Sequence, residues 1–348
     1  KKKILHVVEA MGGGIFTYLV DLVNELTDQY EIYIAYAIRP QTPDNFREYF
    51  DKRVHLIEVN NFTREINPLK DFNALREIKK IAQKVNPDII HLHSSKAGVL
   101  GRIAFDGKGA SVFYTPHGYS FLMKDCNWMK RWLYKGIEAV CAKRNCTTIS
   151  CSLGEHRETL KLTKKAAYVN NGINVKKLQR VIDSIEVKEH PFTVFTLGRI
   201  CYQKNPSLFN QIAEAMPDIK FIWIGDGELR EELKSPNIEV IGWVEREEAL
   251  KIGVNADVFV LTSLWEGLPI SLLESMYMKK LCVVSNVIGN RDVIKNGVNG
   301  FVCNSADEFV RAIGSGTEKI IDRAHQDLIE KYETKGQAER YAEIYNNN

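Results

Sequence analysis

The chain has 348 residues, of which 45% are hydrophobic and 26% charged, a balance typical of soluble globular proteins. This length exceeds one ordinary hydrophobic core and predicts two domains. The formal net charge of +3 is too small to indicate a nucleic-acid partner. Because no apolar run reaches the length of a membrane span and no secretory signal opens the chain, we expect a cytoplasmic protein.

Short β-branched segments alternate with helical patterns along the whole chain, as in parallel sheets built from βαβ units. In the first half, strands are expected at residues 4–9, 31–37, 54–59, 88–93, 111–116 and 146–150. In the second half, they are expected at residues 193–197, 220–224, 238–241, 257–261, 281–285 and 300–302. The sequence therefore predicts an α/β fold of two Rossmann-like, doubly wound domains whose strand ends face a central cleft.

A polar, charged stretch at residues 174–189 separates the two halves. The polar helical tail, residues 322–345, carries Tyr341 and Tyr345 one turn apart, and we expect it to pack back on the first domain. The expected first domain is thus 1–175 plus 330–348, and the second is 176–329.

The first expected strand runs into Gly12–Gly14, and a helix is expected from Ile15. Glycines there let the backbone approach a bulky anion closely. A dinucleotide site would need a third glycine where Thr17 stands, and an acid where the second strand ends near Arg39. A phosphate or substrate loop is therefore favoured, with a plain tight turn as the alternative.

Histidines mark two further strand ends of the first half. His117 ends a strand and precedes a glycine, so it could reach a ligand hydroxyl or phosphate; a structural histidine is the alternative. His91 and His93 fall on one face of a strand with a buried pattern. For that pair we expect satisfied core histidines rather than ligands.

An aromatic and cationic segment, residues 128–135, is predicted to be helical. It includes Trp128, Lys130, Arg131 and Trp132. Aromatics with cations suit a membrane interface, where the rings enter the headgroup zone and the cations meet anionic lipid. An amphipathic helix that buries its aromatics in the domain is the alternative.

Seven cysteines are scattered along the chain without Cys-x-x-Cys or mixed Cys/His metal spacing. This odd number favours reduced core residues over disulfides or a metal site. They are Cys126, Cys141, Cys146, Cys151, Cys201, Cys282 and Cys303.

Two cations follow the first strand of the second half. Arg199 ends that strand and Lys204 lies five residues later. A guanidinium fork and an ammonium group could neutralise a leaving diphosphate, while ordinary surface residues are the alternative. Asp226 and Glu228 resemble a metal-binding pair, but a glycine-rich turn explains them, and we expect no metal site.

Two glutamates bracket the most informative segment of the chain, Glu266 to Glu274. A buried strand runs into it, and a helix is expected from Pro269, at the first helical position, to about Lys280. Free amides at a helix N-terminus attract phosphate. An ionised carboxylate only accepts hydrogen bonds, so the two glutamates would bind hydroxyls. Phosphate flanked by hydroxyls describes a sugar nucleotide.

Taken in order, these segments resemble the family-4 retaining glycosyltransferases of GT-B fold. The resemblance covers nearly the whole chain, and its specificity comes from the order of the motifs. The matching motifs are Gly12–Gly14, Pro116–Gly118, Asn171–Asn174, Gly198-Arg199, Lys204–Pro206, Gly225–Gly227, Gly242–Val244 and Glu266–Glu274.

The resemblance implies a role for each matched side chain. Arg199 and Lys204 would grip the donor diphosphate, and Glu274 would hold the ribose hydroxyls. Glu266 would contact hydroxyls of the transferred sugar, and His117 would lie beside that sugar. With Arg199, Lys204 and Glu266, His117 makes up the expected catalytic set.

The resemblance also implies backbone contacts with the donor. It implies no metal ion and no cofactor. The sugar and phosphate would meet Gly267, Leu268, Pro269 and Ile270; the base would meet Trp243 and Val244; the phosphates and acceptor path would meet Gly13 and Gly14.

The chain is also similar to bacterial transferases of capsule or O-antigen assembly. This similarity implies a UDP-sugar donor that carries a hexose or an N-acetylated (deoxy)hexosamine, such as N-acetylfucosamine. The acceptor would be a polyprenyl-diphosphate-linked saccharide at the inner membrane face, bound by the first domain, while the second binds the donor. Transfer would proceed with retention by front-face attack, with the diphosphate helping to take the acceptor proton.

Other functions remain as alternatives. A UDP-sugar 2-epimerase shares the fold and uses the same donor without an acceptor. A non-catalytic sugar-nucleotide-binding or membrane-scaffold protein has little reason to keep Arg199, Lys204, Glu266 and Glu274 together. A glycosidase is disfavoured because both glutamates lie on one motif rather than on opposite sides of a bond.

Overall fold

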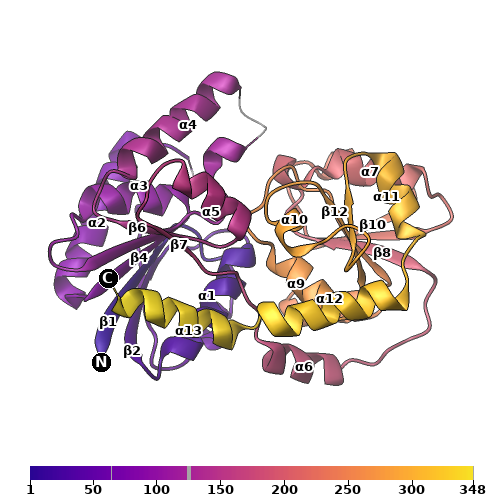
Figure 1. Ribbon diagram of the computed structural model, residues 1–348, viewed down its shortest axis with the longest axis horizontal. Coiled ribbons are helices and arrows are strands. Elements are labelled where there is room, and N and C mark those ends of the chain that lie inside the picture. The colour runs from indigo at the N-terminus through magenta and orange to yellow at the C-terminus, as the bar shows by residue number, and fades with distance from the viewer. Residues whose placement is uncertain (64, 124–126, 348) are drawn as a thin grey trace. The chain divides into compact units, whose positions relative to one another are not determined.

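The computed structural model describes residues 1–63, 65–123 and 127–347 (Figure 1). Cys126 lies outside these residues. The chain forms two compact units: unit 1 is Lys1–Asn171 with Thr334–Asn348, and unit 2 is Gly172–Glu333. The boundaries expected from the sequence, after residues 175 and 329, lie a few residues from these divisions.

Unit 1 is built on a parallel sheet of seven strands in the order β3-β2-β1-β4-β5-β6-β7. Helices cover both of its faces, so the central strands are buried throughout and carry almost continuous apolar runs. The strands are β1 (Lys2–Val8), β2 (Tyr30–Tyr36), β3 (His55–Glu58), β4 (Ile89–His93), β5 (Ser111–Thr115), β6 (Thr147–Ser150) and β7 (Ala166–Tyr168).

Unit 2 repeats this plan with six parallel strands in the order β10-β9-β8-β11-β12-β13. Its core contains Phe209, Trp223 and Phe309 between the sheet and its helices. The strands are β8 (Thr193–Leu197), β9 (Lys220–Ile224), β10 (Ile238–Gly242), β11 (Val258–Leu261), β12 (Leu281–Ser285) and β13 (Phe301–Cys303).

All strands expected from the sequence are present, and their ends are displaced by two residues at most. The prediction of an α/β fold with two doubly wound, Rossmann-like domains is therefore confirmed. It missed β7, because this three-residue edge strand contains no β-branched residue and is only partly buried.

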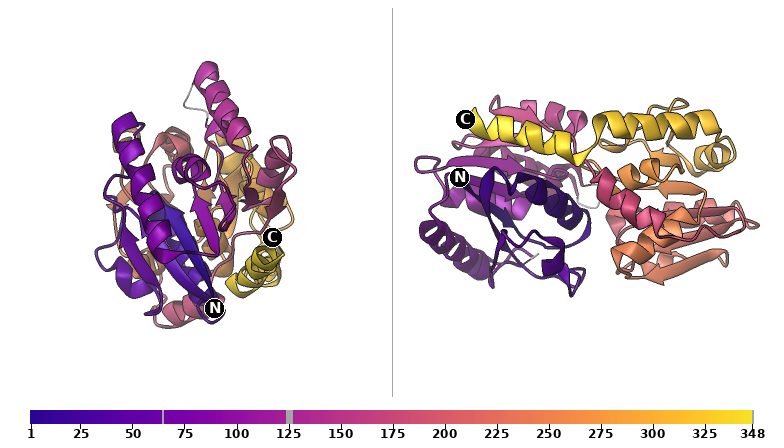
Figure 2. Two further views of the ribbon diagram at one scale, coloured as in Figure 1. Left: turned by 90° about the vertical axis from the view of Figure 1, so that its left-hand side faces the viewer. Right: turned by 90° about the horizontal axis from the view of Figure 1, so that it is seen from below.

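The helices of unit 1 alternate with its strands, except that only a short 3-10 turn lies between β2 and β3. The tail helix α13 returns to this unit and packs beside α1, where the Tyr18 hydroxyl donates to the Tyr341 hydroxyl at 2.8 Å (Figure 2). The helices are α1 (Gly13–Leu26), α2 (Pro68–Val85), α3 (Ser95–Ala104), α4 (Trp128–Cys141), α5 (Leu153–Leu160) and α13 (Thr334–Asn346), with short 3-10 turns at Phe46–Tyr49 and Ser120–Leu122.

The helices of unit 2 are arranged around its sheet in the same way. They are α6 (Val175–Asp183), α7 (Pro206–Glu214), α8 (Arg246–Val254), α9 (Ile270–Tyr277), α10 (Asn290–Val293), α11 (Ala306–Ile313) and α12 (Glu318–Lys331), with 3-10 turns at Tyr202–Lys204 and Arg230–Glu232. Among the described residues, no helix combines the length and the apolar character needed to cross a membrane.

Three predicted helix boundaries are wrong. Helix α1 begins at Gly13 rather than Ile15. Glycine is a poor helix former, so the sequence pattern excluded Gly13 and Gly14 from the helix, although both lie in its first turn. Helix α9 begins at Ile270, with Pro269 as an extended N-cap at ψ 124°, and ends before Lys280. The expected single helical tail is two helices, because Tyr332 leaves the helix and its carbonyl accepts from the Ile173 amide at 2.9 Å.

A buried ion pair fixes α4 on α3 in unit 1. The Arg102 guanidinium donates to Glu138 at 2.8 Å and lies over the Tyr114 ring, whose hydroxyl donates to the same carboxylate at 3.0 Å. Arg102 also donates to the Gly98 carbonyl at 2.9 Å. Burial and the Glu138 charge keep the pKa of Tyr114 well above its ordinary value, so this hydroxyl remains a donor.

Glu138→Ala should destabilise the protein by about 3–5 kcal/mol, because it leaves the Arg102 charge buried without its partner. Urea unfolding followed by circular dichroism measures the loss. The matched control is Glu158→Ala, which removes an ion pair to the exposed Lys161 and should cost at most about 1 kcal/mol. Equal losses in the two variants would contradict this account of how α4 is held.

Candidate active site

The candidate residues of unit 2 lie at the carboxyl edge of its sheet, at the point where the strand order reverses. Strands β8 and β11 are neighbours there, although two strands, β9 and β10, separate them in the sequence. Ligand sites of open α/β sheets form at such switch points. The loop after β8 carries Arg199 and Lys204, and the loop after β11 carries Glu266.

Glycines allow the loop around Arg199 to pack closely on its neighbour. Gly225 has φ +133°, and a Cβ atom there would lie 2.1 Å from the Gly198 carbonyl oxygen. The same oxygen accepts from the indole of Trp223 at 2.8 Å. The Gly225–Gly227 segment thus packs against the Arg199 loop and supports it.

The two acids of that turn face guanidinium groups. Asp226 pairs with Arg230, and Glu228 pairs with Arg199, each at 2.9 Å. The Arg199 side chain is 33% exposed and Glu228 more so, and an ion pair this open to water is weak. Arg199 can therefore exchange this partner for an anionic ligand.

Hydrogen bonds hold the loop after β8 against the loop after β11. The Thr262 hydroxyl donates to the Lys204 carbonyl at 2.6 Å, and the Leu264 amide donates to the Gln203 carbonyl at 2.8 Å. The Gln203 side chain returns a bond to the Trp265 carbonyl at 2.9 Å. These contacts place the Lys204 side chain beside Glu266.

Lys204 and Glu266 form a largely buried ion pair. The Lys204 ammonium lies 2.5 Å from Glu266 Oε1, and the Ser263 hydroxyl donates to the same oxygen at 2.6 Å. Glu266 is 7% exposed. A Cβ atom at Gly289 would lie 2.3 Å from the Gly267 carbonyl oxygen, so a glycine there lets the loop before α10 pack on Glu266 and Gly267.

Glu274 lies one turn into α9 and is 5% exposed. Its Oε1 accepts from the Arg246 guanidinium at 2.5 Å. Arg246 is the first residue of α8 and directly follows the segment of Trp243, which is 53% exposed, and the partly exposed Val244. The ion pair therefore brings the start of α8 to the helix that carries Glu274.

Sequence reasoning missed Arg246, Ser263 and Gly289. Arg246 belongs to no motif, and its only signal is its place at the start of a helix after the Trp243 segment. Ser263 could have been noticed as a hydroxyl at a strand end beside Glu266.

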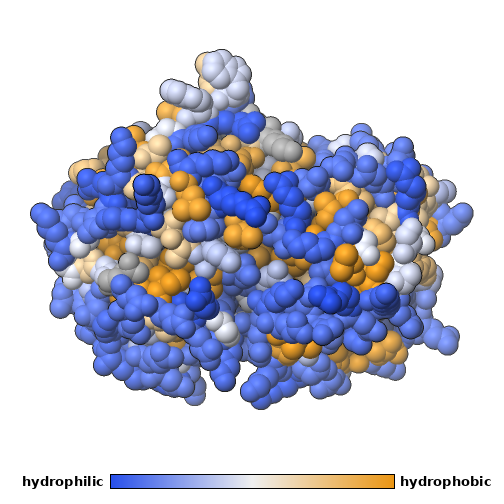
Figure 3. All heavy atoms as spheres, viewed as in Figure 1, coloured by the Kyte–Doolittle hydropathy of each residue, from blue (hydrophilic) through white to orange (hydrophobic). Residues whose placement is uncertain are grey.

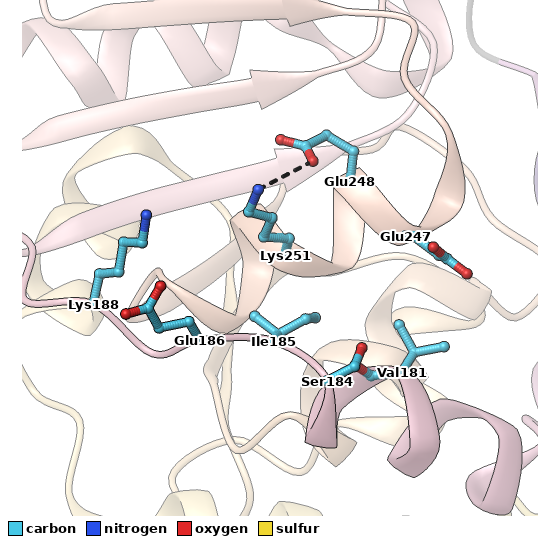
Figure 4. Close-up of a pocket in the computed structure, with 8 residues that line it drawn as sticks. All are labelled: Val181, Ser184, Ile185, Glu186, Lys188, Glu247, Glu248 and Lys251. Atoms are coloured by element: carbon cyan, nitrogen blue, oxygen red, sulfur yellow. Dashed lines mark hydrogen bonds and ion pairs between the residues drawn. The ribbon is translucent and has the colours of Figure 1, made fainter.

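The structure shows one surface groove in unit 2 that does not include these residues. It has a volume of about 360 Å³ and lies between the end of α6 and α8 (Figure 4). Lys251 and Glu248 form an ion pair on its wall at 3.6 Å. None of the predicted site residues lines this groove, so its position does not support it as the donor site.

In unit 1 the corresponding switch point lies between β1 and β4. The Gly12–Gly14 loop follows β1, and Gly13 has φ +61°. Gly13 and Gly14 are exposed, and a Cβ atom at either would meet no other atom. Beside the loop, Arg39 forms an ion pair with Glu9, so a cation shortly after β2 is paired with the acid that directly follows β1.

His117 follows β5 in unit 1 and has φ +54°, a left-handed conformation that is uncommon for residues other than glycine. Its Nε2 lies 3.1 Å from Nδ1 of His93, and the Tyr18 ring packs edge-on against it. Burial lowers the pKa of His117 to about 3, so the ring is neutral at physiological pH. The prediction for His91 and His93 is confirmed: both are buried, with both ring nitrogens hydrogen-bonded.

The aromatic and cationic segment forms α4, as predicted, but its tryptophans do not enter the core. Trp128 and Trp132 are 76% and 77% exposed, and Lys130 and Arg131 lie beside them. The alternative in which this helix buries its tryptophans is therefore wrong. In Figure 3 the tip of α4, at the top, has a pale surface rather than the deep blue of the surrounding charged residues.

Comparison with known proteins identifies the family. The model of the family described as glycosyl transferases group 1 matches residues 154–332, and that of glycosyltransferase family 4 matches residues 12–177. The chain is 34% identical over 299 residues to an Escherichia coli UDP-Gal:alpha-D-GlcNAc-diphosphoundecaprenol alpha-1,3-galactosyltransferase, and the aligned residues make up 76% of each protein.

A second relative and a solved structure extend this comparison. The chain is 37% identical over 332 residues, 89% of this chain and 87% of the relative, to a Campylobacter jejuni GalNAc-alpha-(1->4)-GalNAc-alpha-(1->3)-diNAcBac-PP-undecaprenol alpha-1,4-N-acetyl-D-galactosaminyltransferase. The structure of Anabaena HepE in complex with UDP-glucose has a TM-score of 0.78 at 16% identity, with full coverage of both chains. The chain therefore belongs to the group 1 glycosyl transferases, a family-4 type, and has the GT-B fold.

Proposed function

We propose that this glycosyltransferase moves a sugar from a UDP-sugar to a saccharide on polyprenyl diphosphate, with retention, in capsule or O-antigen assembly. The observation that carries the proposal is the pair of ion pairs, Lys204–Glu266 and Arg246–Glu274, on the two sides of the α9 N-terminus. This arrangement combines cations for a diphosphate with carboxylates for the hydroxyls on either side of it.

The donor diphosphate would bind at Arg199, Lys204 and the first amides of α9. Arg199 exchanges its exposed Glu228 partner for phosphate oxygens, and Lys204 contributes its ammonium without leaving Glu266. Both cations then stabilise the negative charge that grows on the leaving diphosphate. We propose that these two side chains, rather than a metal ion, supply that stabilisation.

The two glutamates take different hydroxyls. Both contacts of Glu266 are made through Oε1, so we assign Oε2 to a hydroxyl of the transferred sugar. Glu274 holds the ribose, and Arg246 orients its carboxylate from the start of α8. The exposed Trp243 and the partly exposed Val244, which precede Arg246, would then lie near the base.

Retention follows if the acceptor attacks the face from which the diphosphate leaves. The acceptor oxygen bonds to the anomeric carbon as the bond to the β-phosphate oxygen breaks, and the acceptor proton passes to that phosphate oxygen. The sequence supplies no side chain with an evident role as a double-displacement nucleophile, and this pathway needs none.

The names of the two relatives bear on the sugar. One is a galactosyltransferase and the other an N-acetyl-D-galactosaminyltransferase, and both act on undecaprenol-linked acceptors. Galactose and N-acetylgalactosamine share an axial hydroxyl at C4, and so does N-acetylfucosamine. We therefore propose a galacto-configured hexose or N-acetylated (deoxy)hexosamine. Neither 2-epimerase activity nor non-catalytic binding has a specific observation in its favour.

The acceptor would be reached at the inner face of the cytoplasmic membrane, where α4 binds the lipid surface. Around Trp128, Trp132 and their apolar neighbours lie Lys130 and Arg131, and the one acid of α4, Glu138, is buried in an ion pair. An exposed apolar strip with cations and without exposed acids suits anionic lipid.

Glu274→Ala should weaken the binding of UDP by about tenfold or more, because the ribose loses hydrogen bonds to a charged acceptor. Isothermal calorimetry with UDP alone measures this affinity. Glu247→Ala, on the exposed face of α8, is the matched control and should bind like the wild type. Unchanged UDP affinity in Glu274→Ala would refute the ribose assignment.

Arg199→Ala and Lys204→Ala should each slow sugar transfer by on the order of 100-fold, since each removes a charge that stabilises the leaving diphosphate. Transfer is measured with UDP-galactose and UDP-N-acetylgalactosamine, and thermal unfolding confirms that the variants are folded. Lys220→Ala, which loses only an exposed pair with Glu239, serves as the control. Wild-type turnover in either site variant would show that these cations do not act on the diphosphate.

The double variant Trp128→Ala/Trp132→Ala should lose most of its binding to vesicles that contain anionic phospholipid, because the substitutions remove both rings that would insert into the headgroup region. Co-sedimentation at low and high salt measures binding, and salt should weaken the wild type through its cations. Val187→Ala changes an equally exposed apolar residue of unit 2 and should have no effect. If the double variant sediments like the wild type, α4 is not the lipid-binding surface.

A further inference from the structure

Four histidines converge within unit 1. His6 on β1 is paired in register with His91 on β4, and His93 follows two residues later on the same face. His117 follows the neighbouring strand β5. The first three are completely buried, whereas His117 is partly exposed.

Three of these rings form a chain of hydrogen bonds. His6 Nδ1 lies 3.0 Å from His93 Nε2, and His93 Nδ1 lies 3.1 Å from His117 Nε2. His91 does not belong to the chain, because its nitrogens contact the Tyr345 hydroxyl at 2.6 Å and the Thr115 hydroxyl at 2.8 Å. His93 thus links the buried His6 to the partly exposed His117.

All three rings of the chain are neutral at physiological pH. Burial lowers the pKa of His6 and of His117 to about 3 and keeps the pKa of His93 well below its ordinary value. A neutral imidazole has one N–H and one lone pair. Each contact joins an N–H to a lone pair, so the two bonds must run in the same direction along the chain.

The buried end of the chain decides which direction holds. His6 Nε2 is buried and has no hydrogen-bond partner among the described residues. If the bonds ran inward from His117, this nitrogen would carry an unpaired N–H. If they run outward, it carries only a lone pair, and buried N–H groups without an acceptor are the rarer case in proteins. The outward direction is therefore favoured.

We propose that His6 and His93 are positioning residues that hold His117 as the Nδ1–H tautomer, so that His117 donates a hydrogen bond to a substrate oxygen. His6 donates through Nδ1 to His93, which donates through its own Nδ1 to His117 Nε2. His117 Nδ1, which has no partner among the described residues, then carries the free N–H. This inference rests on the proposed function and on the role that the family resemblance implies for His117, beside the donor sugar.

The tautomer has a consequence for the proposed reaction. With its lone pair engaged by His93, His117 can donate to a sugar hydroxyl or a phosphate oxygen but cannot accept the acceptor proton. That proton must go elsewhere, in agreement with its proposed transfer to the leaving diphosphate.

Nitrogens of His6, His91 and His93 lie within 4.8 Å of one another, a spacing that could also hold a metal ion. Hydrogen bonds explain the arrangement better. Both nitrogens of His91 already have hydroxyl partners, and the facing nitrogens of His6 and His93 are at hydrogen-bond distance.

The tautomers can be measured without any substrate. Long-range proton–nitrogen correlation spectra of the ¹⁵N-histidine-labelled protein at pH 7 should show His6, His93 and His117 as neutral Nδ1–H forms, unchanged by added Zn²⁺. A His117 signal in the Nε2–H or protonated form would overturn the proposal. So would a Zn²⁺-dependent shift of His6 and His93, which would indicate a metal site instead.

Two variants of His93 separate positioning from packing. His93→Asn places an amide two bonds from Cβ, where Nδ1 was, and can still donate to His117. His93→Gln places its amide three bonds from Cβ, at the distance of Nε2, and can reach His6 but not His117. We expect His93→Asn to keep kcat within about threefold and His93→Gln to lower it about tenfold to 100-fold, with unchanged affinity for UDP.

His91→Phe is the matched control, because it removes two hydrogen bonds from the same strand, keeps an aromatic ring beside His6 and His93, and removes no hydrogen bond of the chain. It should lower stability while leaving the His117 spectrum and kcat nearly unchanged. Equal losses of kcat in His93→Asn and His93→Gln, or a loss in His91→Phe as large as in His93→Gln, would overturn the positioning role. If the wild type transfers no sugar at all, the proposed function fails, while the spectra still decide the tautomer.

Discussion

The buried ion pair between Lys204 and Glu266 is the contact on which the candidate site depends. It joins two loops that leave neighbouring parallel strands, β8 and β11, at the point where the strand order of unit 2 reverses. Parallel strands deliver their loops to one edge of the sheet, and a reversal leaves the two central loops side by side. Hydrogen bonds from Thr262 and Gln203 then fix their spacing, so the charge of Lys204 is held beside Glu266, in the loop that leads into α9.

The electrostatics of this edge are balanced before any ligand arrives. Each glutamate of the motif has its own cation, Lys204 for Glu266 and Arg246 for Glu274. Arg199 has the weakest partner, because its pair with Glu228 is the most exposed of the three. In the proposed site, a diphosphate would take Arg199 without exposing a buried carboxylate, while the two buried pairs would keep the oxygens assigned to hydroxyls in place.

The sequence was most informative about features that depend on local pattern. Apolar runs and glycine-rich turns predicted twelve strands, and all twelve are present in the structure. Their alternation with helices predicted the doubly wound topology. It missed β7, whose three residues carry no strand pattern, and it placed Pro269 inside α9 although its extended backbone only caps that helix. The helix or strand propensity of a residue says which backbone conformations it can adopt, and contacts with the rest of the fold decide which of them it adopts.

The predicted side chains were found at strand ends and helix starts, but their partners could not be predicted. Arg246 at the start of α8 contacts Glu274 of α9 only in the folded chain, and nothing in the local sequence indicates that contact. The same holds for His6, which lies in the first strand and completes the hydrogen-bonded chain to His117. The exposure of Trp128 and Trp132 could not be predicted either, because an amphipathic pattern alone does not say whether tryptophans pack inward or face solvent.

The central claim is that the protein uses a UDP-sugar to extend a lipid-linked saccharide. The most direct measurement incubates the protein with UDP-galactose or UDP-N-acetylgalactosamine, with and without a polyprenyl-diphosphate-linked saccharide, and follows both UDP release and the lipid product. The account predicts UDP release only when the acceptor is present, with one sugar added to the lipid-linked saccharide in the same anomeric configuration as the donor. UDP release together with a free 2-epimer in the absence of acceptor would contradict it.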